Sequence, residues 1–568
     1  MDPSGMDEVA DFVVVGNGGG SMCAGLFMRS IGKSVVVLEK TDLAGGTTAR
    51  SGGVMWIPNN RFMKEDGVED SDEKAMTYLG ATAGQSPNAP AATRERLQTY
   101  VTEGPKMVDF LVSQGVRLRR VKSWPDYYDD RPGGSVPGRT VVAELFNVNE
   151  LGPWAKKLRP NFMQIPANLD ESMFLGSYKQ SWAGKAMVAK VGLRGAMAKL
   201  TGKHWVTAGA ALQGRMLQAA LKAGVDIRLQ SPVKTFIMEN GAVTGVVTTK
   251  DGRDWKIGAR LGVLVNAGGF AQNQEMLDKY IPGVSAQWTA TTPGDTGEMI
   301  QELVKLGAAT AQMEEMVGNQ MAIPPGAANT SGDGVALGAV GGQMNIAKPH
   351  SILVDQTGVR YMNEGGSYME FCKNMLERDK VAPANPSYWI IDQKYLDEYL
   401  FCGTMPGSKK PDQWFTSGFL KKADTIEDLA RQIGVDPARL KATVDRFNAD
   451  VKAGRDTEFK RGDRAYDRWL GDAYHGPNQA LGTIEKAPYY ASPVVPGNVG
   501  TYGGVMTDTN ARVLREDGTP IPGLYATGVT TASVMGRYYP GAGASIGPSF
   551  TWGYVAAKHA SGAGNWAG

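Results

Sequence analysis

The 568-residue chain has few cysteines and histidines, which limits the kinds of site that it can form. Its three cysteines, Cys23, Cys372 and Cys402, make no CxxC pair and no even-numbered disulfide framework. We therefore expect the reduced interior of a cell, and so a cytoplasmic protein. Its four histidines are scattered along the sequence, and none lies near the glycine-rich loops of the first 60 residues. This distribution predicts no metal site.

The sequence also lacks long apolar runs and a strong excess of one charge. No apolar run reaches the roughly 18 residues that a membrane-spanning helix needs. Residues 1–8 are polar, so we expect no signal peptide. The formal net charge is +2, which predicts no nucleic-acid partner. The 73 glycines and 42% hydrophobic residues are typical of a large α/β enzyme, and the length suggests two domains.

The first strong pattern is a β-loop-α-β unit. Residues 12–15 and 34–38 are apolar, β-branched runs of strand length, with a glycine-rich loop and a helical spacing between them. Gly16 and Gly18 permit a tight turn and let a pyrophosphate approach the amides at the positive end of the helix. Glu39 lies 23 positions after Gly16, where an acid accepts hydrogen bonds from an adenosine ribose. We predict a dinucleotide site here rather than a glycine-rich turn without a ligand.

A second loop, rich in glycine and hydroxyl groups, distinguishes between dinucleotides. It covers residues 44–60 and follows Glu39-Lys40 directly. A nicotinamide enzyme rarely needs such a loop, whereas a flavin enzyme wraps a long cofactor whose ring lies far from its adenine. The sequence therefore favours FAD over an ordinary polar surface loop. The scattered histidines indicate that this FAD is bound non-covalently.

Residues 172–225 form a stretch that is both cationic and apolar. It has eight basic and no acidic residues, interleaved with Trp, Phe, Met, Val and Leu. Such a segment can hold a peripheral protein on an anionic membrane surface, and the surface we expect here is the inner face of the cell membrane. The other interpretation is a solvated helix that covers the nucleotide domain. Gly184, Gly192 and Gly195 weaken the expectation of a long amphipathic helix here.

Downstream patterns predict the domain order. Asn240-Gly241 and Asp251-Gly252 separate alternating runs, as in β-hairpins. We expect an α/β protein in which a Rossmann-like FAD-binding domain carries an inserted α+β catalytic domain. The FAD-binding domain would comprise residues 1–315, with the cationic insertion at about 150–206, and a return segment at 500–568. The catalytic domain would comprise residues 316–499.

Several motifs together resemble a known flavoprotein family. They are Glu39-Lys40, Gly45-Gly-Thr-Thr48, Ala49-Arg-Ser-Gly52, Asn266-Ala-Gly-Gly269, Arg360-Tyr-Met-Asn-Glu364 and Gly523-Leu-Tyr-Ala-Thr-Gly528. This set resembles the flavoproteins of fumarate reductase and succinate dehydrogenase. More narrowly, Pro125-Asp-Tyr-Tyr128, Asn363-Glu-x-x-x-Tyr368 and Tyr539-Pro-Gly-x-Gly543 resemble the 3-ketosteroid Δ1-dehydrogenases. One departure is Ala542, where that family has proline.

The resemblance implies a reaction and a role for each matched residue. Enzymes of this family remove two hydrogens, one each from C1 and C2 of a 3-ketosteroid. We expect the substrates to include sterols with a hydrocarbon side chain, such as cholest-4-en-3-one. The Tyr539 hydroxyl and the Gly543 amide would bind the C3 ketone oxygen. Tyr368 would take the C2 proton, Tyr127 would support it, and hydride would pass from C1 to flavin N5. The sequence does not identify the acceptor of the flavin's electrons.

The resemblance also implies the FAD-binding residues. These are Gly16, Gly18, Gly19, Gly20, Ser21, Glu39, Lys40, Gly45, Gly46, Thr47, Thr48, Ser51, Gly52, Gly53, Val233, Ala267, Gly268, Gly528, Ser545 and Ile546.

Other functions remain open at this point. A fumarate reductase would grip two carboxylates, for which Arg360 and His350 are the nearby candidates. A 3-ketosteroid 4(5α)-dehydrogenase would act on C4 and C5 of the same nucleus. A non-enzymatic flavin-binding subunit would leave the tyrosines as packing residues.

Overall fold

The computed structural model describes residues 5–176, 178–327 and 335–563. Its largest sheet has eight strands in the described chain, with the order β19-β20-β11-β1-β2-β8; β10 also pairs with β11, and β9 pairs with β10. The parallel strands are β1 (Glu8–Val15), β2 (Val35–Leu38), β8 (Asp226–Arg228), β11 (Arg253–Val265) and β20 (Pro520–Ala526). The antiparallel strands are β9 (Val233–Glu239), β10 (Ala242–Lys250) and β19 (Arg512–Leu514).

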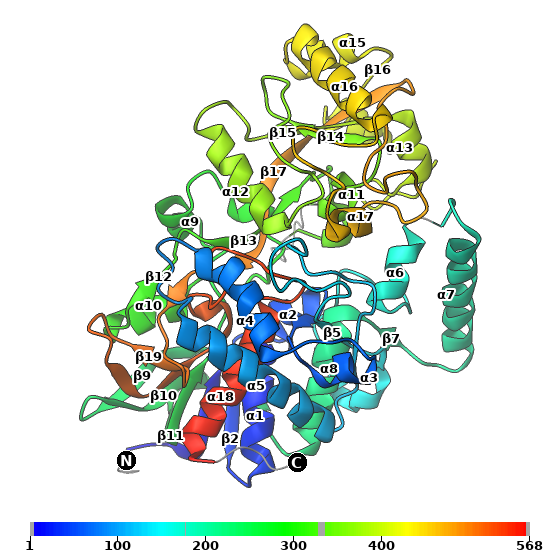
Figure 1. The fold of residues 1–568 in the computed structure, drawn as a ribbon. Coiled ribbons are helices and arrows are strands. Elements are labelled where there is room, and N and C mark those ends of the chain that lie inside the picture. Colours follow the sequence, from blue (N-terminus) through cyan, green and yellow to red (C-terminus); the bar gives the residue numbers. More distant parts are fainter. Residues whose placement is uncertain (1–4, 177, 328–334, 564–568) are drawn as a thin grey trace.

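Helices cover this sheet and bury its apolar strands. β2 and the second half of β1, residues 12–15, are wholly apolar and buried, as expected for central strands of a parallel sheet. The helices beside them are α1 (Gly19–Ser30), α5 (Arg94–Ser113), α8 (Ala208–Lys222) and α18 (Ile546–Ser561) (Figure 1). The chain's last described helix therefore packs on its first. The expected Rossmann-like α/β fold is present.

A second, antiparallel sheet lies above the first one in Figure 1. It consists of β13 (Met316–Met321), β14 (Ser351–Val354), β15 (Ser387–Asp392), β16 (Lys421–Ala423) and β17 (Tyr489–Thr501). Its helices are α11 (Gln343–Ile346), α12 (Tyr368–Asp379), α13 (Gln393–Glu398), α14 (Asp412–Thr416), α15 (Ile426–Ile433), α16 (Pro437–Lys452) and α17 (Ala465–Leu470). Each sheet has apolar clusters of its own, and a further, larger cluster joins Phe12 of the parallel sheet with Val317 of β13 and Met369 of α12. The expected boundaries at 315/316 and 499/500 stay a prediction.

The insertion is an excursion between two paired strands. β6 (Phe146–Asn147) pairs with β7 (Trp205–Val206), and the chain between them contains α6 (Leu169–Leu175) and α7 (Trp182–Leu200). The three glycines do not interrupt α7, which is continuous from Trp182 to Leu200. The Ser181 hydroxyl caps its first turn, and Glu171 of α6 forms ion pairs with Lys190 and Arg194. These contacts offset the cost of about 1 kcal/mol for each glycine.

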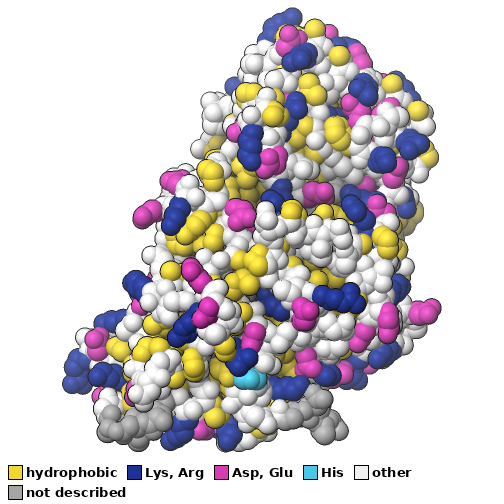
Figure 2. Space-filling view, turned by 60° about the vertical axis from the view of Figure 1, so that its left-hand side comes forward, with side chains coloured by type: hydrophobic (Ala, Val, Ile, Leu, Met, Phe, Trp, Pro, Cys, Tyr) yellow, Lys and Arg dark blue, Asp and Glu magenta, His cyan; other side chains and the backbone are white. Residues whose placement is uncertain are grey.

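The surface carries both charge signs. On the face drawn in Figure 2, basic and acidic side chains are interspersed and form no large patch of one sign. The described chain holds no helix long and apolar enough to cross a membrane.

Candidate active site

A cavity of about 470 Å³ lies where four parallel strands of the large sheet end. Gly16 follows β1, Glu39 follows β2, Ala267 follows β11 and Gly528 follows β20, and all four residues line it. Ligands of open parallel sheets bind at this carboxyl edge. The cavity then extends toward the second sheet as far as Tyr368.

The glycine loop is shaped for a close ligand approach. Gly16 has φ +91°, and a Cβ there would lie 2.3 Å from the Asn266 carbonyl oxygen, so only glycine fits. Gly18 is the residue before α1 and contributes no side chain to cap it. The first amides of this helix therefore stay available for a phosphate.

Two carboxylates lie in the same cavity. Glu39 accepts hydrogen bonds from the Asn17 amide at 3.1 Å and from the amide and hydroxyl of Thr41, each at 2.9 Å. Asp295 is buried, and its Oδ2 has no hydrogen-bond partner among the described residues. Burial raises the pKa of Asp295 to about 6, although the Gly269 and Ala271 amides oppose the shift. An orphaned buried oxygen in this position suits the hydroxyl groups of a dinucleotide.

Most of the expected cofactor residues line this cavity. They are Gly16, Gly18, Glu39, Lys40, Gly46, Thr47, Thr48, Ser51, Gly52, Val233, Ala267, Gly268, Gly528, Ser545 and Ile546. Gly19, Gly20, Ser21, Gly45 and Gly53 are not among the lining residues. A Cβ on Gly19 or Gly20 would overlap Phe550 or Ser549 of α18, so these two glycines let α1 pack on α18.

Three tyrosines that are far apart in the sequence meet at the far end of the cavity. The ring centroids lie 5.7 Å apart for Tyr127 and Tyr368, 5.1 Å for Tyr368 and Tyr539, and 5.9 Å for Tyr127 and Tyr539. Tyr368 is thus a ring neighbour of both other phenols. All three line the cavity.

A buried ion network fixes the loop that carries Tyr127. Asp126 accepts hydrogen bonds from Trp56 Nε1 at 2.8 Å and from Arg139 Nη1 at 2.5 Å. The other face of the Arg139 guanidinium binds Asp70 in a bidentate manner, at 2.8 and 2.7 Å. The Arg139 side chain is fully buried, so the network is water-free and rigid. It holds the neighbouring tyrosine in one position.

The phenols lie in an environment that disfavours their charged form. Burial, followed by the neighbouring phenols, raises the pKa of Tyr127 and of Tyr368 well above 10. Burial also raises the pKa of Tyr539, but its bond with Tyr368 and the amides of Ser545 and Gly543 oppose the shift. The Gly543 amide therefore lies close to the Tyr539 hydroxyl. Two hydrogen-bond donors are neighbours here, as a site for a developing oxyanion requires.

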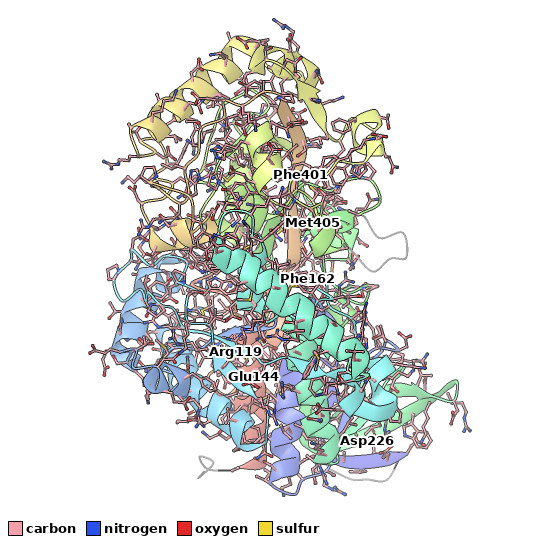
Figure 3. The ribbon with its side chains drawn as sticks, turned by 90° about the vertical axis from the view of Figure 1, so that its right-hand side faces the viewer. Arg119, Glu144, Phe162, Asp226, Phe401 and Met405 are labelled. Atoms are coloured by element: carbon pink, nitrogen blue, oxygen red, sulfur yellow. The ribbon has the colours of Figure 1, made fainter. Side chains whose placement is uncertain are left out.

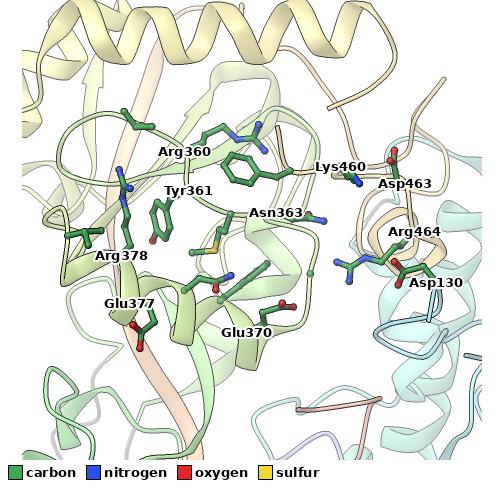
Figure 4. A pocket seen from close by; sticks show the side chains of 17 residues that line it. Asp130, Arg360, Tyr361, Asn363, Glu370, Glu377, Arg378, Lys460, Asp463 and Arg464 are labelled. Carbon is green, nitrogen blue, oxygen red and sulfur yellow. The ribbon is translucent and has the colours of Figure 1, made fainter. Parts of the chain in front are cut away.

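A second cavity, of about 930 Å³, lies beside α12 and has a charged lining (Figure 4). Arg360 lines it, but its guanidinium is buried and bonded to Glu364 and Asp456. His350 is also buried, with Nδ1 2.6 Å from the Thr483 carbonyl oxygen. Neither residue lines the cofactor cavity. The cationic pair that a dicarboxylate enzyme would need is therefore not at this site.

Comparison with known proteins agrees with this geometry. The sequence profile of a family described as FAD binding domain matches residues 11–546. The 3-oxosteroid 1-dehydrogenase of Mycolicibacterium smegmatis is 38% identical over 567 residues, which are 96% of each chain. The chain belongs to the family of FAD-dependent 3-oxosteroid 1-dehydrogenases.

Two other members of this family are informative. A crystal structure of 3-ketosteroid Δ1-dehydrogenase from Sterolibacterium denitrificans, in complex with 1,4-androstadiene-3,17-dione, superposes with a TM-score of 0.89 at 34% identity. That match covers 98% of this chain and all of the other. The 4-oxocyclohexanecarboxylate 2-dehydrogenase of Sinomonas cyclohexanicum is 35% identical over 97% of this chain and 93% of its own. The family thus includes oxidoreductases named for a smaller cyclic ketone.

The sequence alone did not reveal three residues of the site of this oxidoreductase. Asp295 lies in Gly294-Asp-Thr-Gly297, a segment that matches none of the motifs of the sequence analysis. Tyr466 stacks on Tyr127 at a centroid distance of 4.3 Å, and Gln343 donates to its hydroxyl. Tyr466 and Gln343 belong to short helices with no motif of their own, so only tertiary structure brings them to the site.

Proposed function

We propose that this flavoenzyme desaturates the C1–C2 bond of a 3-oxosteroid. The observation that carries the proposal is the cluster of Tyr127, Tyr368 and Tyr539 at the end of the cofactor cavity. FAD, when bound, supplies the acceptor for the hydride. The glycine loop, Glu39 and the α1 amides would hold its pyrophosphate and ribose.

We assign the binding of the ketone to Tyr539 and Gly543. The Tyr539 hydroxyl and the Gly543 amide would donate to the C3 oxygen, where negative charge develops as the C2 proton leaves. Their proximity to each other supports this role. The carbonyl of Gly543 accepts from the Trp56 amide at 3.2 Å, which holds the loop in register with β3 (Val54–Trp56).

We assign proton removal to Tyr368 and its support to Tyr127. A free phenol has a pKa of about 10, so its phenolate costs roughly 4 kcal/mol at pH 7, and burial adds to this cost. We propose that the neighbouring Tyr127 hydroxyl turns to donate to Tyr368 as the C2 proton leaves, which would stabilise the phenolate form of Tyr368. The buried network around Asp126 keeps this donor in place.

Anaerobic titration of the FAD-loaded enzyme tests the reaction. We expect androst-4-ene-3,17-dione to bleach the flavin and to yield the 1,4-diene, and 4-oxocyclohexanecarboxylate to bleach it more slowly. Formation of a C4–C5 double bond from a 5α-steroid would instead establish a 4(5α)-dehydrogenase. Reduction of the flavin by 4-oxocyclohexanecarboxylate but not by the steroid would also refute the assignment. So would oxidation of a reduced dye by fumarate.

We propose further that α7 contacts an anionic membrane surface. Trp182, Leu193, Met197 and Leu200 lie near multiples of the helical period and share one side of α7. Their exposed fractions are 83%, 66%, 51% and 83%. The helix stands away from the body of the protein in Figure 1 and faces the viewer in Figure 3.

Charge complementarity supports this peripheral contact. Lys185 and Lys199 are exposed on α7, and Lys203 follows it. An apolar helix side flanked by lysines suits the interface of anionic lipids. Residues of the same excursion, Phe162 and Leu169, line the catalytic cavity. We propose that this excursion admits tailed sterols such as cholest-4-en-3-one.

Vesicle flotation tests the membrane contact. We expect the enzyme to float with phosphatidylserine-containing vesicles and to lose this binding in the variant Leu193→Asp/Leu200→Asp. Val381→Asp serves as the matched control, because Val381 is 78% exposed and lies outside the excursion. Equal binding by both variants, or none by the unmodified enzyme, would refute the contact. Deletion of the α7 segment should impair turnover of cholest-4-en-3-one more than that of androstenedione.

A further inference from the structure

A buried ion triad joins the two segments that carry Tyr368 and Tyr539. Glu315 directly precedes β13, is 1% exposed, and its carboxylate contacts two cations. Lys373 Nζ lies 2.7 Å from Glu315 Oε2, and Arg537 Nε lies 2.5 Å from Glu315 Oε1. Lys373 Nζ also donates to the Arg537 carbonyl oxygen at 2.5 Å. Each member of the triad therefore contacts both others, and we call these three residues the clasp.

The two cations of the clasp lie close in sequence to the two phenols. Lys373 belongs to α12, five residues after Tyr368. Arg537 lies two residues before Tyr539, in the loop that leads into α18. α12 packs on β13 of the antiparallel sheet, whereas α18 packs on α1 of the FAD-binding part. The clasp thus spans the junction between the part of the chain that carries the base and the part that carries the ketone donor.

Glu315 also supports the loop of Tyr539 through its main chain. Its carbonyl oxygen accepts from the Tyr502 amide at 2.8 Å. The ring centroids of Tyr502 and Tyr539 lie 6.0 Å apart, and the Tyr502 hydroxyl donates to the Ala544 carbonyl oxygen at 3.1 Å. Glu315 therefore reaches this loop by its backbone as well as by its carboxylate.

The proposed reaction makes the separation of the two phenols important. Tyr368 would take a proton from C2 while Tyr539 donates to the oxygen on C3, so both would act on neighbouring atoms of one rigid ring. A misplacement of about 1 Å can cost such a reaction about 100-fold in rate. None of the clasp residues lines the cofactor cavity, so the clasp can act on this separation without contact to substrate or flavin.

We propose that Glu315 fixes the spacing of Tyr368 and Tyr539 by holding Lys373 against Arg537. This inference rests on the proposed function. The clasp residues are positioning residues, since they act through the two tyrosines. Their opposite charges hold them together, because neither carboxylate oxygen of Glu315 has a hydrogen bond of regular geometry among the described residues.

Variants of the clasp can be matched to a control on the same helix. Lys373→Met opens the clasp and retains the side-chain length, whereas Lys373→Arg retains the charge. Arg537→Met opens it from the other side. Arg378→Met is the matched control: Arg378 also belongs to α12, but its Nη2 lies 2.7 Å from Asp355 Oδ2, in the segment after β14. The control therefore removes an ion pair of α12 that does not involve the loop of Tyr539.

The test measures the limiting rate of anaerobic flavin reduction by androst-4-ene-3,17-dione in the FAD-loaded variants. For Lys373→Met and Arg537→Met we expect a loss of about 10- to 100-fold, with a change of less than about threefold in the dissociation constant of the steroid. Lys373→Arg and Arg378→Met should stay near the unmodified rate. In the Tyr368→Phe background, Lys373→Met should cost less than about threefold, because no base remains to be misplaced.

Three results of this test would overturn the inference. They are an unchanged limiting rate in Lys373→Met, an equal loss in Arg378→Met, and the full loss on adding Lys373→Met to Tyr368→Phe. The last result would mean that the clasp stabilises the protein in general and does not act through the phenols.

Hydrogen–deuterium exchange of the FAD-loaded enzyme without substrate separates this inference from the proposed function. We expect the amides of residues 536–543 and of the start of α12 to exchange faster in Lys373→Met, and at the unmodified rate in Arg378→Met. If no 3-oxosteroid reduces the flavin, the proposed function fails, yet the exchange still decides whether the clasp joins the two segments. Unchanged exchange in Lys373→Met would refute the clasp itself.

Discussion

Gly543→Ala should separate ketone activation from cofactor binding. Gly543 has φ +99°, a conformation that costs an L-residue about 1–2 kcal/mol. A Cβ there would lie 2.5 Å from the Val54 carbonyl oxygen and 2.6 Å from Met55 Cα and N. These atoms are backbone of β3, which cannot rotate aside, so the loop has to shift. The Gly543 amide would then move away from the Tyr539 hydroxyl.

The expected effect follows from the loss of one oxyanion donor. Removal of such a donor lowers kcat by about 100- to 1,000-fold. Gly543 does not line the cofactor cavity, so we expect FAD to remain bound. The assay measures flavin content by absorbance, and then the rate of flavin reduction by androst-4-ene-3,17-dione under anaerobic conditions.

Gly307→Ala is the matched control for the backbone strain. Gly307 has φ +88°, and no heavy atom lies within 4 Å of a Cβ built there. We expect it to lose about 1 kcal/mol of stability and to keep its activity. A Gly543→Ala holoenzyme that is reduced at the unmodified rate would refute the assignment of this amide. Equal losses of activity in both variants would show that strain alone accounts for the effect.

Three further predictions concern the base, its support and the cofactor. Tyr368→Phe should reduce the rate of flavin reduction by about 100- to 10,000-fold. The rate of the unmodified enzyme should rise with pH, because burial raises the pKa of Tyr368 and only the phenolate accepts the proton. A rate that does not change with pH, measured where chemistry is rate-limiting, would contradict this. Arg139→Met should lower the free energy of unfolding by about 3–5 kcal/mol in urea titrations, because Asp70 and Asp126 are left buried and unpaired; a smaller loss would mean that water reaches them. Glu39→Ala should weaken FAD binding to the apoprotein by about 10- to 100-fold, since one charged acceptor is lost; unchanged affinity would place the ribose elsewhere.

The parts of the fold that were predictable are those with strong local patterns. The apolar runs at 12–15 and 34–38 became β1 and β2, and the Asn-Gly and Asp-Gly turns join β9, β10 and β11 as expected. Period and turn chemistry are properties of a few neighbouring residues, so the sequence shows them directly. The carboxyl edge of the sheet then follows from topology.

The rest depended on contacts between distant segments. The length of α7 depends on Glu171 of another helix, which local glycine propensity does not include. Tyr466 and Gln343 reach the site through Asp129 and Gly366, and neither contact leaves a pattern in the sequence. The tyrosines of the expected site were found through the resemblance, because no periodicity distinguishes a catalytic phenol from a packing one.

The placement of Tyr368 at the first turn of α12 means that the active site is assembled from two parts of the chain. Tyr368 belongs to the part of the chain that carries the antiparallel sheet, whereas Gly16 and Glu39 end strands of the parallel sheet. Proton acceptance and cofactor retention are thus carried by separately built halves. A mutation that loosens the junction between them would give a protein that binds its full complement of flavin but has no activity. Flavin absorbance alone would therefore not show whether the active site is intact.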